Sequence, residues 1–136
     1  MPLAISGGGY QTNDGNLNEV KLGVSAAPAT ATATATLSVA QVLNGQILGS
    51  PGATAASYTL PTVALLEATL VNAKVGSTFF FNVINVDGSA AGVITMVAGT
   101  GWTIVGLATV AAVAGTAQLF FARKTGVGAW TLYRYG

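Results

Sequence analysis

Hydrophobic residues recur at every second position through most of this chain, which is the period of a β-strand with one buried face. The alternation starts in the segment Glu19–Val24. In the second half, short apolar runs are separated by glycine-containing turns. Their spacing predicts an antiparallel meander in which Asp87-Gly88 turns the first run back onto the second. The expected strands are 78–86, 93–97, 102–105, 109–113, 118–124 and 130–135.

Residues 29–36 repeat Ala-Thr four times. In a strand this repeat would place every threonine on one face and every alanine on the other. A low-complexity tract after Pro28 is also typical of a linker, so both interpretations stay open. The β-branched threonines favour the strand, because the alternation continues towards Leu43. Asn44-Gly45 then predicts a two-residue hairpin turn that returns through 46–48.

A single segment has helical spacing. Val63, Leu66 and Leu70 recur at the period of a helix, and Pro61 suits its first turn. We expect one helix, Val63–Val71, lying against a sheet or across the mouth of a sandwich. The remaining short strands, broken by glycine, predict an all-β sandwich, jelly roll or barrel.

Residues 1–18 have a different composition from the rest, with glycine and small polar residues and little to bury. They are either a frayed terminus or an arm that becomes ordered on a partner surface. The candidate contact residues of such an arm are Leu3, Ile5, Tyr10 and Leu17. We therefore divide the chain into an arm, 1–18, and a single β-sandwich domain, 19–136.

Missing residue types exclude most catalytic chemistry. The 136 residues include no histidine and no cysteine, which removes the commonest general base, the commonest metal ligand and the reactive thiolate. Four scattered acids remain: Asp14, Glu19, Glu67 and Asp87. The glycine pair Gly99-Thr100-Gly101 precedes a predicted strand, whereas a phosphate site needs a helix. We expect no enzyme, no metal site and no cofactor.

Low charge predicts a surface that neighbours cover. Charged residues make up 7% of the chain, against about 25% in typical soluble domains. The consecutive Phe79-Phe80-Phe81 suggests burial on both faces of its strand, which in a small domain implies a subunit neighbour.

Nucleic acid and membrane are not expected partners. The net charge is +1 and no basic run is present, whereas phosphate binding needs clustered lysine and arginine. The uncharged stretch 103–122 is followed by Arg123 and Lys124, like a membrane span, but Ala, Gly, Thr and Gln dilute it. The segment 1–10 has neither the basic start nor the apolar core of a signal peptide.

Four aromatic residues could form a sugar-stacking platform, although such residues more often belong to cores and interfaces. They are Trp102, Trp130, Tyr133 and Tyr135.

Four segments of the second half together resemble a known family. They are 58–66 (YTLPTVALL), 75–85 (VGSTFFFNVIN), 99–106 (GTGWTIVG) and 123–133 (RKTGVGAWTLY). This succession resembles a module of tailed-bacteriophage structural proteins, particularly small capsid decoration (cement) proteins, over residues 57–136. The resemblance implies a jelly-roll-like antiparallel β-sandwich, usually a homotrimer, seated on the outer capsid surface of the virion where capsomers meet.

The resemblance also implies that the partners are further copies of the chain and the major capsid protein, and that the N-terminal region reaches onto the shell. Two alternatives stay open. One is a module of a phage tail fibre or head fibre, and the other is a lectin-like carbohydrate-binding module.

Overall fold

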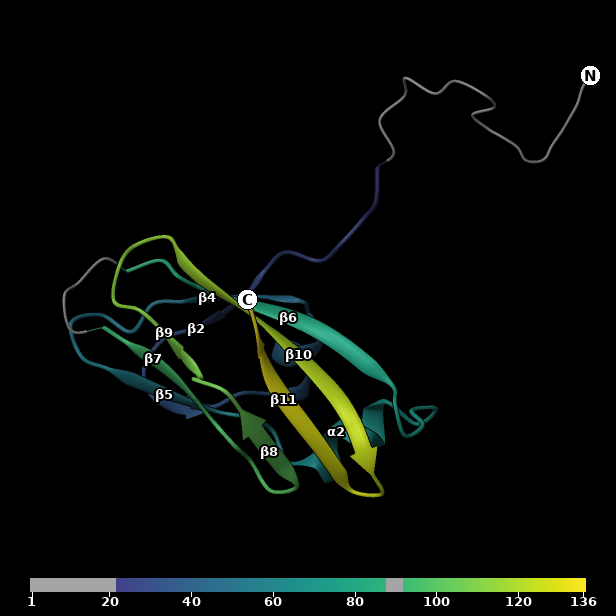
Figure 1. Ribbon diagram of the computed structural model, residues 1–136. Coiled ribbons are helices and arrows are strands. Elements are labelled where there is room, and N and C mark those ends of the chain that lie inside the picture. Colours follow the sequence, from purple (N-terminus) through teal and green to yellow (C-terminus); the bar gives the residue numbers. More distant parts are fainter. Residues whose placement is uncertain (1–21, 88–91) are drawn as a thin grey trace, which may run out of the picture.

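The structure, a computed structural model, describes residues 22–87 and 92–136, and strands dominate it (Figure 1). In chain order the elements are β2 (Ala29–Ala31), β3 (Ala35–Thr36), α1 (Val39–Leu43), β4 (Gln46–Gly49), β5 (Ala56–Thr59), α2 (Val63–Thr69), β6 (Thr78–Asn85), β7 (Ile94–Val97), β8 (Trp102–Val105), β9 (Thr109–Val110), β10 (Thr116–Gly126) and β11 (Ala129–Tyr135). They form a six-stranded sheet, β2-β4-β6-β10-β11-β8, and a four-stranded sheet, β3-β5-β7-β9.

The first half of the chain forms successive solenoid-like turns, called coils below, and each coil passes once through each sheet. Strands β2, β4 and β6 are parallel neighbours in the large sheet, and β3, β5 and β7 are parallel neighbours in the small one. Each coil therefore contributes one strand to each sheet. The first two coils also carry a short helix after the small-sheet strand, α1 after β3 and α2 after β5.

The expected antiparallel order is wrong. Among the described residues, five of the eight strand pairings are parallel, including β11 with β8. The expected hairpin of 78–86 with 93–97 does not form, because β7 lies in the other sheet from β6. Antiparallel pairing does hold for the C-terminal hairpin of β10 and β11, for β10 with β6 and for β7 with β9.

The expectation of a single helix is also wrong, because residues expected to continue a strand form α1. Ser38 caps it: its hydroxyl accepts from the backbone N–H of Gln41, and the Gln41 side chain accepts from the backbone N–H of Ser38. Asn44 is the C-cap of this helix, so Asn44-Gly45 is not a hairpin turn. Val42 is the residue of α1 that is fully buried.

The expected helix at Val63 is confirmed and is two residues shorter than predicted, ending at Thr69. The Thr62 hydroxyl accepts from the Leu65 N–H at its start. Val63 and Leu66 face the core, while Glu67 lies on the half-buried side.

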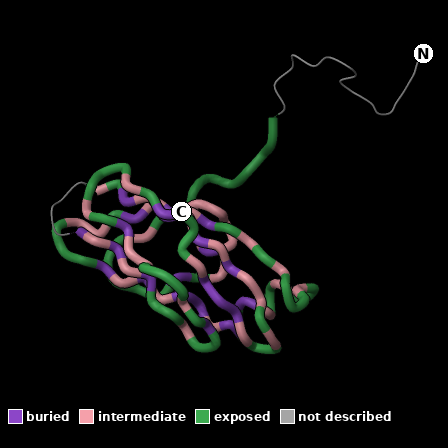
Figure 2. The backbone as a smooth tube through the Cα atoms, viewed as in Figure 1, coloured by how far each residue is buried: buried purple, intermediate pink, exposed green. Residues whose placement is uncertain are grey.

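The Ala-Thr repeat is strand at both ends and irregular in the middle. Its first residues form β2 and its last two form β3, so the repeat crosses from one sheet to the other. The crossing is fixed by Tyr58, whose hydroxyl lies 2.7 Å from the Thr32 carbonyl oxygen and 3.1 Å from that of Ala31. Residues 22–28 form no strand and are exposed along their length (Figure 2), so the strand expected from Glu19 does not extend into them.

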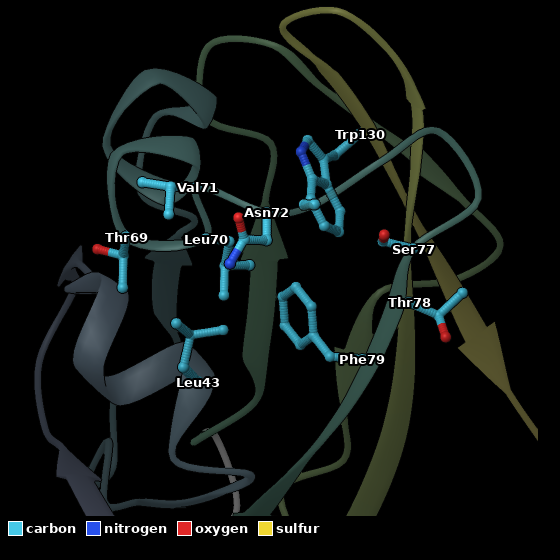
Figure 3. A pocket seen from close by; sticks show the side chains of 10 residues that line it. Leu43, Thr69, Leu70, Val71, Asn72, Ser77, Thr78, Phe79 and Trp130 are labelled. Atoms are coloured by element: carbon cyan, nitrogen blue, oxygen red, sulfur yellow. The ribbon is translucent and has the colours of Figure 1, made fainter.

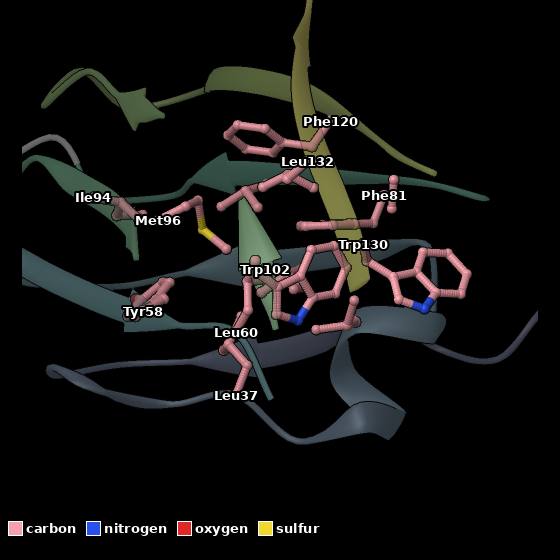
Figure 4. Packing of buried hydrophobic residues seen from close by; sticks show 14 of the residues in the cluster. Leu37, Tyr58, Leu60, Phe81, Ile94, Met96, Trp102, Phe120, Trp130 and Leu132 are labelled. Carbon is pink, nitrogen blue, oxygen red and sulfur yellow. The ribbon is translucent and has the colours of Figure 1, made fainter. Parts of the chain in front are cut away.

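One hydrophobic core joins the two sheets. The large sheet contributes Phe81, Phe120 and Leu132, and the small sheet faces them with Tyr58, Ile94 and Met96 (Figure 4). Trp102 and Trp130 lie side by side in this core with ring centroids 6.0 Å apart. Leu37, Leu60 and Val63 close it beside the helices.

Asn85 is fully buried, and its side chain holds together the loops at one end of the sheets by hydrogen bonds. Its side-chain nitrogen donates to the carbonyl oxygens of Gly92 (2.7 Å) and Ala111 (3.0 Å). Its side-chain oxygen accepts from the Asp87 N–H at 3.0 Å. Both ends of the amide are thus satisfied, as a buried polar group requires.

Candidate functional site

The outer face of the six-stranded sheet is the candidate functional surface, because it is rich in aromatic residues and carries little charge. Side chains alternate along each strand, so β6 places Phe81 and Val83 in the core and Phe80, Asn82 and Ile84 on the outside. The same alternation on the other strands gives rows of outward residues across the sheet. The outward positions are Thr30, Gln46, Leu48, Thr78, Phe80, Asn82, Ile84, Thr103, Val105, Ala117, Leu119, Phe121, Arg123, Thr131, Tyr133 and Tyr135.

An aromatic cluster occupies the middle of this outer face. Phe121 is the partner of both Phe80 and Tyr133 in the strand register, and Tyr133 is the partner of Val105. The Phe80 ring centroid lies 4.9 Å from that of Phe121 and 5.4 Å from that of Tyr135. Phe121 and Tyr133 are 5.8 Å apart. These are favourable aromatic pair distances, so the four rings form one continuous patch.

The patch is open to solvent within the described part of the chain. Phe80 is 46% exposed, Tyr135 57% and Val105 50%. Leu48 and Ile84 extend the apolar surface towards β2. We refer below to the sixteen outward positions together as the outer face.

Charge is nearly absent from the outer face. Arg123 is the only charged residue among its sixteen positions, and it lies in a row with Thr78 and Thr131 at one border. Arg134 turns the other way and donates to the Leu107 carbonyl oxygen at 2.9 Å. The outer face is therefore suited to burial against another surface.

A pocket of about 350 Å³ lies on a different side, between the end of α2 and the start of β6 (Figure 3). Phe79 and Trp130 line it opposite Leu43 and Leu70, and Asn72 adds a polar side chain. None of the described residues that line it is charged, and its polar side chains include the Asn72 amide and the hydroxyls of Thr69, Ser77 and Thr78. The pocket can therefore accept an apolar group.

Beside the pocket, Glu67 and Lys124 form an ion pair with an N–O distance of 2.7 Å. The Lys124 ammonium also lies 3.4 Å from the Ala73 carbonyl oxygen. The hydrogen bond from Lys124 holds the pKa of Glu67 below its ordinary value, with a smaller contribution from Trp130. A carboxylate stabilised in this way is a structural contact rather than a proton donor at neutral pH.

The candidate contact residues Leu3, Ile5, Tyr10 and Leu17 lie outside the described residues, as do Asp14 and Glu19. The four aromatic residues considered as a sugar platform are divided between two faces. Trp102 and Trp130 are core residues, 7% and 1% exposed, while Tyr133 and Tyr135 belong to the outer face.

Across residues 22–87 and 92–136, no cluster of three or more acidic side chains could hold a metal ion. No helix in the same ranges is long and apolar enough to cross a membrane. Comparison with protein-family models, with curated proteins and with solved structures gives no match.

Sequence reasoning indicated that the Phe79–Phe81 run needs a neighbour, but it did not find the outer face. The patch depends on which strands are adjacent, because Phe80, Phe121 and Tyr133 come from three strands. The available signal was the alternation within each strand, which places Phe121 with Leu119, and Tyr133 with Tyr135, on one side.

Proposed function

We propose that this protein is a virion structural protein: a capsid decoration (cement) protein that binds the outer capsid shell between capsomers and stabilises it. The observation that carries the structural role is the outer face, an aromatic sheet surface with one charge that suits assembly with another protein subunit, whether a further copy of the chain or the shell. An extended apolar surface of this kind is typical of a protein–protein interface. The resemblance of residues 57–136 to decoration proteins suggests that the assembly is a bacteriophage capsid.

The proposed assembly is a homotrimer that works without catalysis or cofactor, with the major capsid protein as its other partner. Several weak contacts of one trimer with a regular shell add up, so each contact can be modest. The proposal also takes the two sheets with their shared core to be a β-sandwich related to the jelly roll. In this chain, parallel pairs replace many of the antiparallel pairs usual in that fold.

Binding to purified capsids tests the proposal directly. Capsids lacking the protein are mixed with the recombinant chain, and bound copies are counted by sedimentation and located by cryo-electron microscopy. We expect saturable binding at fixed positions on the outer shell, and capsids that withstand higher temperatures when decorated. A protein found only in tails would overturn the decoration proposal.

The N-terminal arm is tested in the same assay. We propose that residues 1–18 dock on the shell or on an adjacent subunit through Leu3, Ile5, Tyr10 and Leu17. Each side chain that is fully buried contributes about 1.5–3 kcal/mol, whereas ordering a residue costs about 1–2 kcal/mol. Deletion of residues 2–18 should leave a folded oligomer that binds capsids weakly. Decoration equal to that of the full chain would show that the segment is a frayed end.

One observation favours the fibre alternative. The coiled path of β2 to β7, with one strand per sheet in each coil, is the arrangement that solenoid modules use. Labelling the protein with gold-conjugated antibodies in intact particles separates the two functions, because a fibre module would appear at the tail or on a projecting head fibre.

A further inference from the structure

We infer that the outer face is the surface through which copies of this chain assemble, so that a second copy covers it in solution before any shell is met. The inference deepens the proposed function, since it assigns one of its two partners to one surface. The shell contact then lies elsewhere on the oligomer.

The size of the outer face suits such an interface. At about 3.3 Å per residue, the eight residues of β6 extend about 26 Å, and the axes of six strands spaced by about 4.8 Å span about 24 Å. The shorter β2, β4 and β8 reduce the area, but the projecting rings add to it. The result is of the same order as the roughly 800 Å² that each partner buries in a stable interface.

The chemistry of the outer face favours a permanent partner. Obligate interfaces between identical subunits are more apolar than those between proteins that meet later, and tyrosine and phenylalanine are enriched in their centres. A decoration protein must remain soluble until a shell is available. An aromatic face left open during that time would promote aggregation, whereas another copy of the chain is present from synthesis onwards.

The position of Arg123 is compatible with this arrangement. It lies in the row of threonines at one border, and the rows that contain Phe80, Leu119 and Ile84 carry no charge. A neighbouring subunit can therefore cover the aromatic and aliphatic rows without burying an unpaired guanidinium group, which would be costly.

The test removes two exposed rings of the outer face. In the full chain, Phe80→Ser and Tyr135→Ser are combined, and the matched control combines Leu65→Ser and Leu107→Ser, which remove apolar side chains of 60% and 66% exposure elsewhere. Sedimentation velocity over a concentration series gives the oligomeric state. Removing a central aromatic residue weakens association at least about tenfold, so we expect a folded monomer for the first variant and an oligomer for the control. A first variant that is folded and as large as the wild type would overturn the inference, as would a monomeric wild type.

A second measurement remains decisive if the double variant fails to fold. The chain has no cysteine, so Phe80→Cys and, as control, Leu107→Cys each carry one thiol. Covering of the outer face should make labelling of Cys at position 80 by a soluble maleimide clearly slower than labelling at position 107. Equal labelling rates in the native oligomer would contradict the inference.

Capsid binding distinguishes failure of this inference from failure of the proposed function. If the Phe80→Ser/Tyr135→Ser variant stays oligomeric but no longer binds capsids, the outer face contacts the shell and the inference is wrong while the function stands. If the wild type forms an oligomer that the variant cannot form, but binds no capsid, the inference is supported and the proposed function is wrong.

Discussion

The indole nitrogen of Trp130 donates a hydrogen bond to the Glu67 carboxylate at 3.1 Å, and the same carboxylate oxygen binds the Lys124 ammonium at 2.7 Å. Glu67 belongs to α2, while Trp130 and Lys124 face each other across the β10–β11 hairpin. One carboxylate therefore attaches the helix of the second coil to the C-terminal hairpin, two parts of the chain far apart in sequence.

Glu67→Gln should weaken the dependence of stability on acidic pH. The pKa of Glu67 is lowered in the folded state, so its stabilising contribution is complete above the ordinary pKa of 4.5 and is lost as the pH falls through the lowered value. We expect the melting temperature of the wild type to fall between about pH 5 and pH 3. In the variant, which keeps an acceptor for Trp130, this fall should be smaller. Parallel melting curves for both proteins across this range would contradict the assignment.

Tyr58→Phe should destabilise the protein by about 0.5–1.5 kcal/mol, the usual net value of one hydrogen bond. The loss is modest because the Ala31 carbonyl oxygen keeps its bond from the Ser50 N–H, at 2.9 Å. Chemical denaturation measures the change, and Tyr135→Phe, at a residue 57% exposed, is the control.

The same tyrosine predicts an alkaline effect. Burial raises the pKa of Tyr58 above its ordinary value of 10.0, so its contribution is complete below pH 10 and is lost as the pH rises through the raised value. The wild type should therefore lose stability above pH 10 more steeply than Tyr58→Phe. Identical slopes in denaturation midpoints above pH 10 would show that the hydroxyl is not sequestered.

Asn85→Asp should be more harmful at neutral pH than Asn85→Ala. The aspartate would direct an ionised oxygen at the Gly92 or Ala111 carbonyl oxygen in place of a donor, and a buried group left without its partner costs about 1–3 kcal/mol, more when charged. Protonation at low pH restores one donor, so the difference between the variants should shrink there. Urea denaturation at pH 7 and pH 4 makes the comparison, and a constant difference would count against this role.

Gly99→Ala should destabilise the turn between β7 and β8 by about 1–3 kcal/mol, the usual cost of overpacking. A Cβ on Gly99 would overlap the Leu60 carbonyl oxygen, and backbone cannot move aside as a flexible side chain can. Gly126→Ala is the matched control, because a Cβ there meets only the Ala129 Cβ at 3.9 Å. Thermal melts of the two variants should differ clearly. Equal melting temperatures would mean that the turn relaxes freely.

The local sequence pattern was sufficient to predict the positions of most strands in the second half of the chain. The run Phe79–Phe81 and the alternation before Tyr135 are strong signals, and both lie in the strands expected of them. Pairing direction was not predictable in this way. Whether β7 returns beside β6 or crosses to the other sheet depends on contacts between distant segments, such as Ala56 with Ile94.

The misread segment before Asn44 contained an overlooked signal. Ser38 followed three residues later by Gln41 is a capping box, and it starts a helix where the alternation of Leu37 and Val39 suggested a strand. Five residues are too few for helical periodicity to be visible, so the cap was the only local indication. The outer face could not be assembled at all without the strand order, although three of its aromatic residues, Phe80, Tyr133 and Tyr135, were noted in the sequence.

The coiled path of the first half has a consequence for how this protein can change length. Ala29 pairs with Ile47 and Ile47 with Val83 in one sheet, while Ala35 pairs with Tyr58 and Tyr58 with Met96 in the other. Duplication of a whole coil would therefore add one strand to each sheet and preserve the register of the strands already present. An insertion of an odd number of residues within a strand would turn the side chains beyond it to the opposite face. In this architecture, added residues disturb the two sheets least when they form complete coils or lie in the connecting loops.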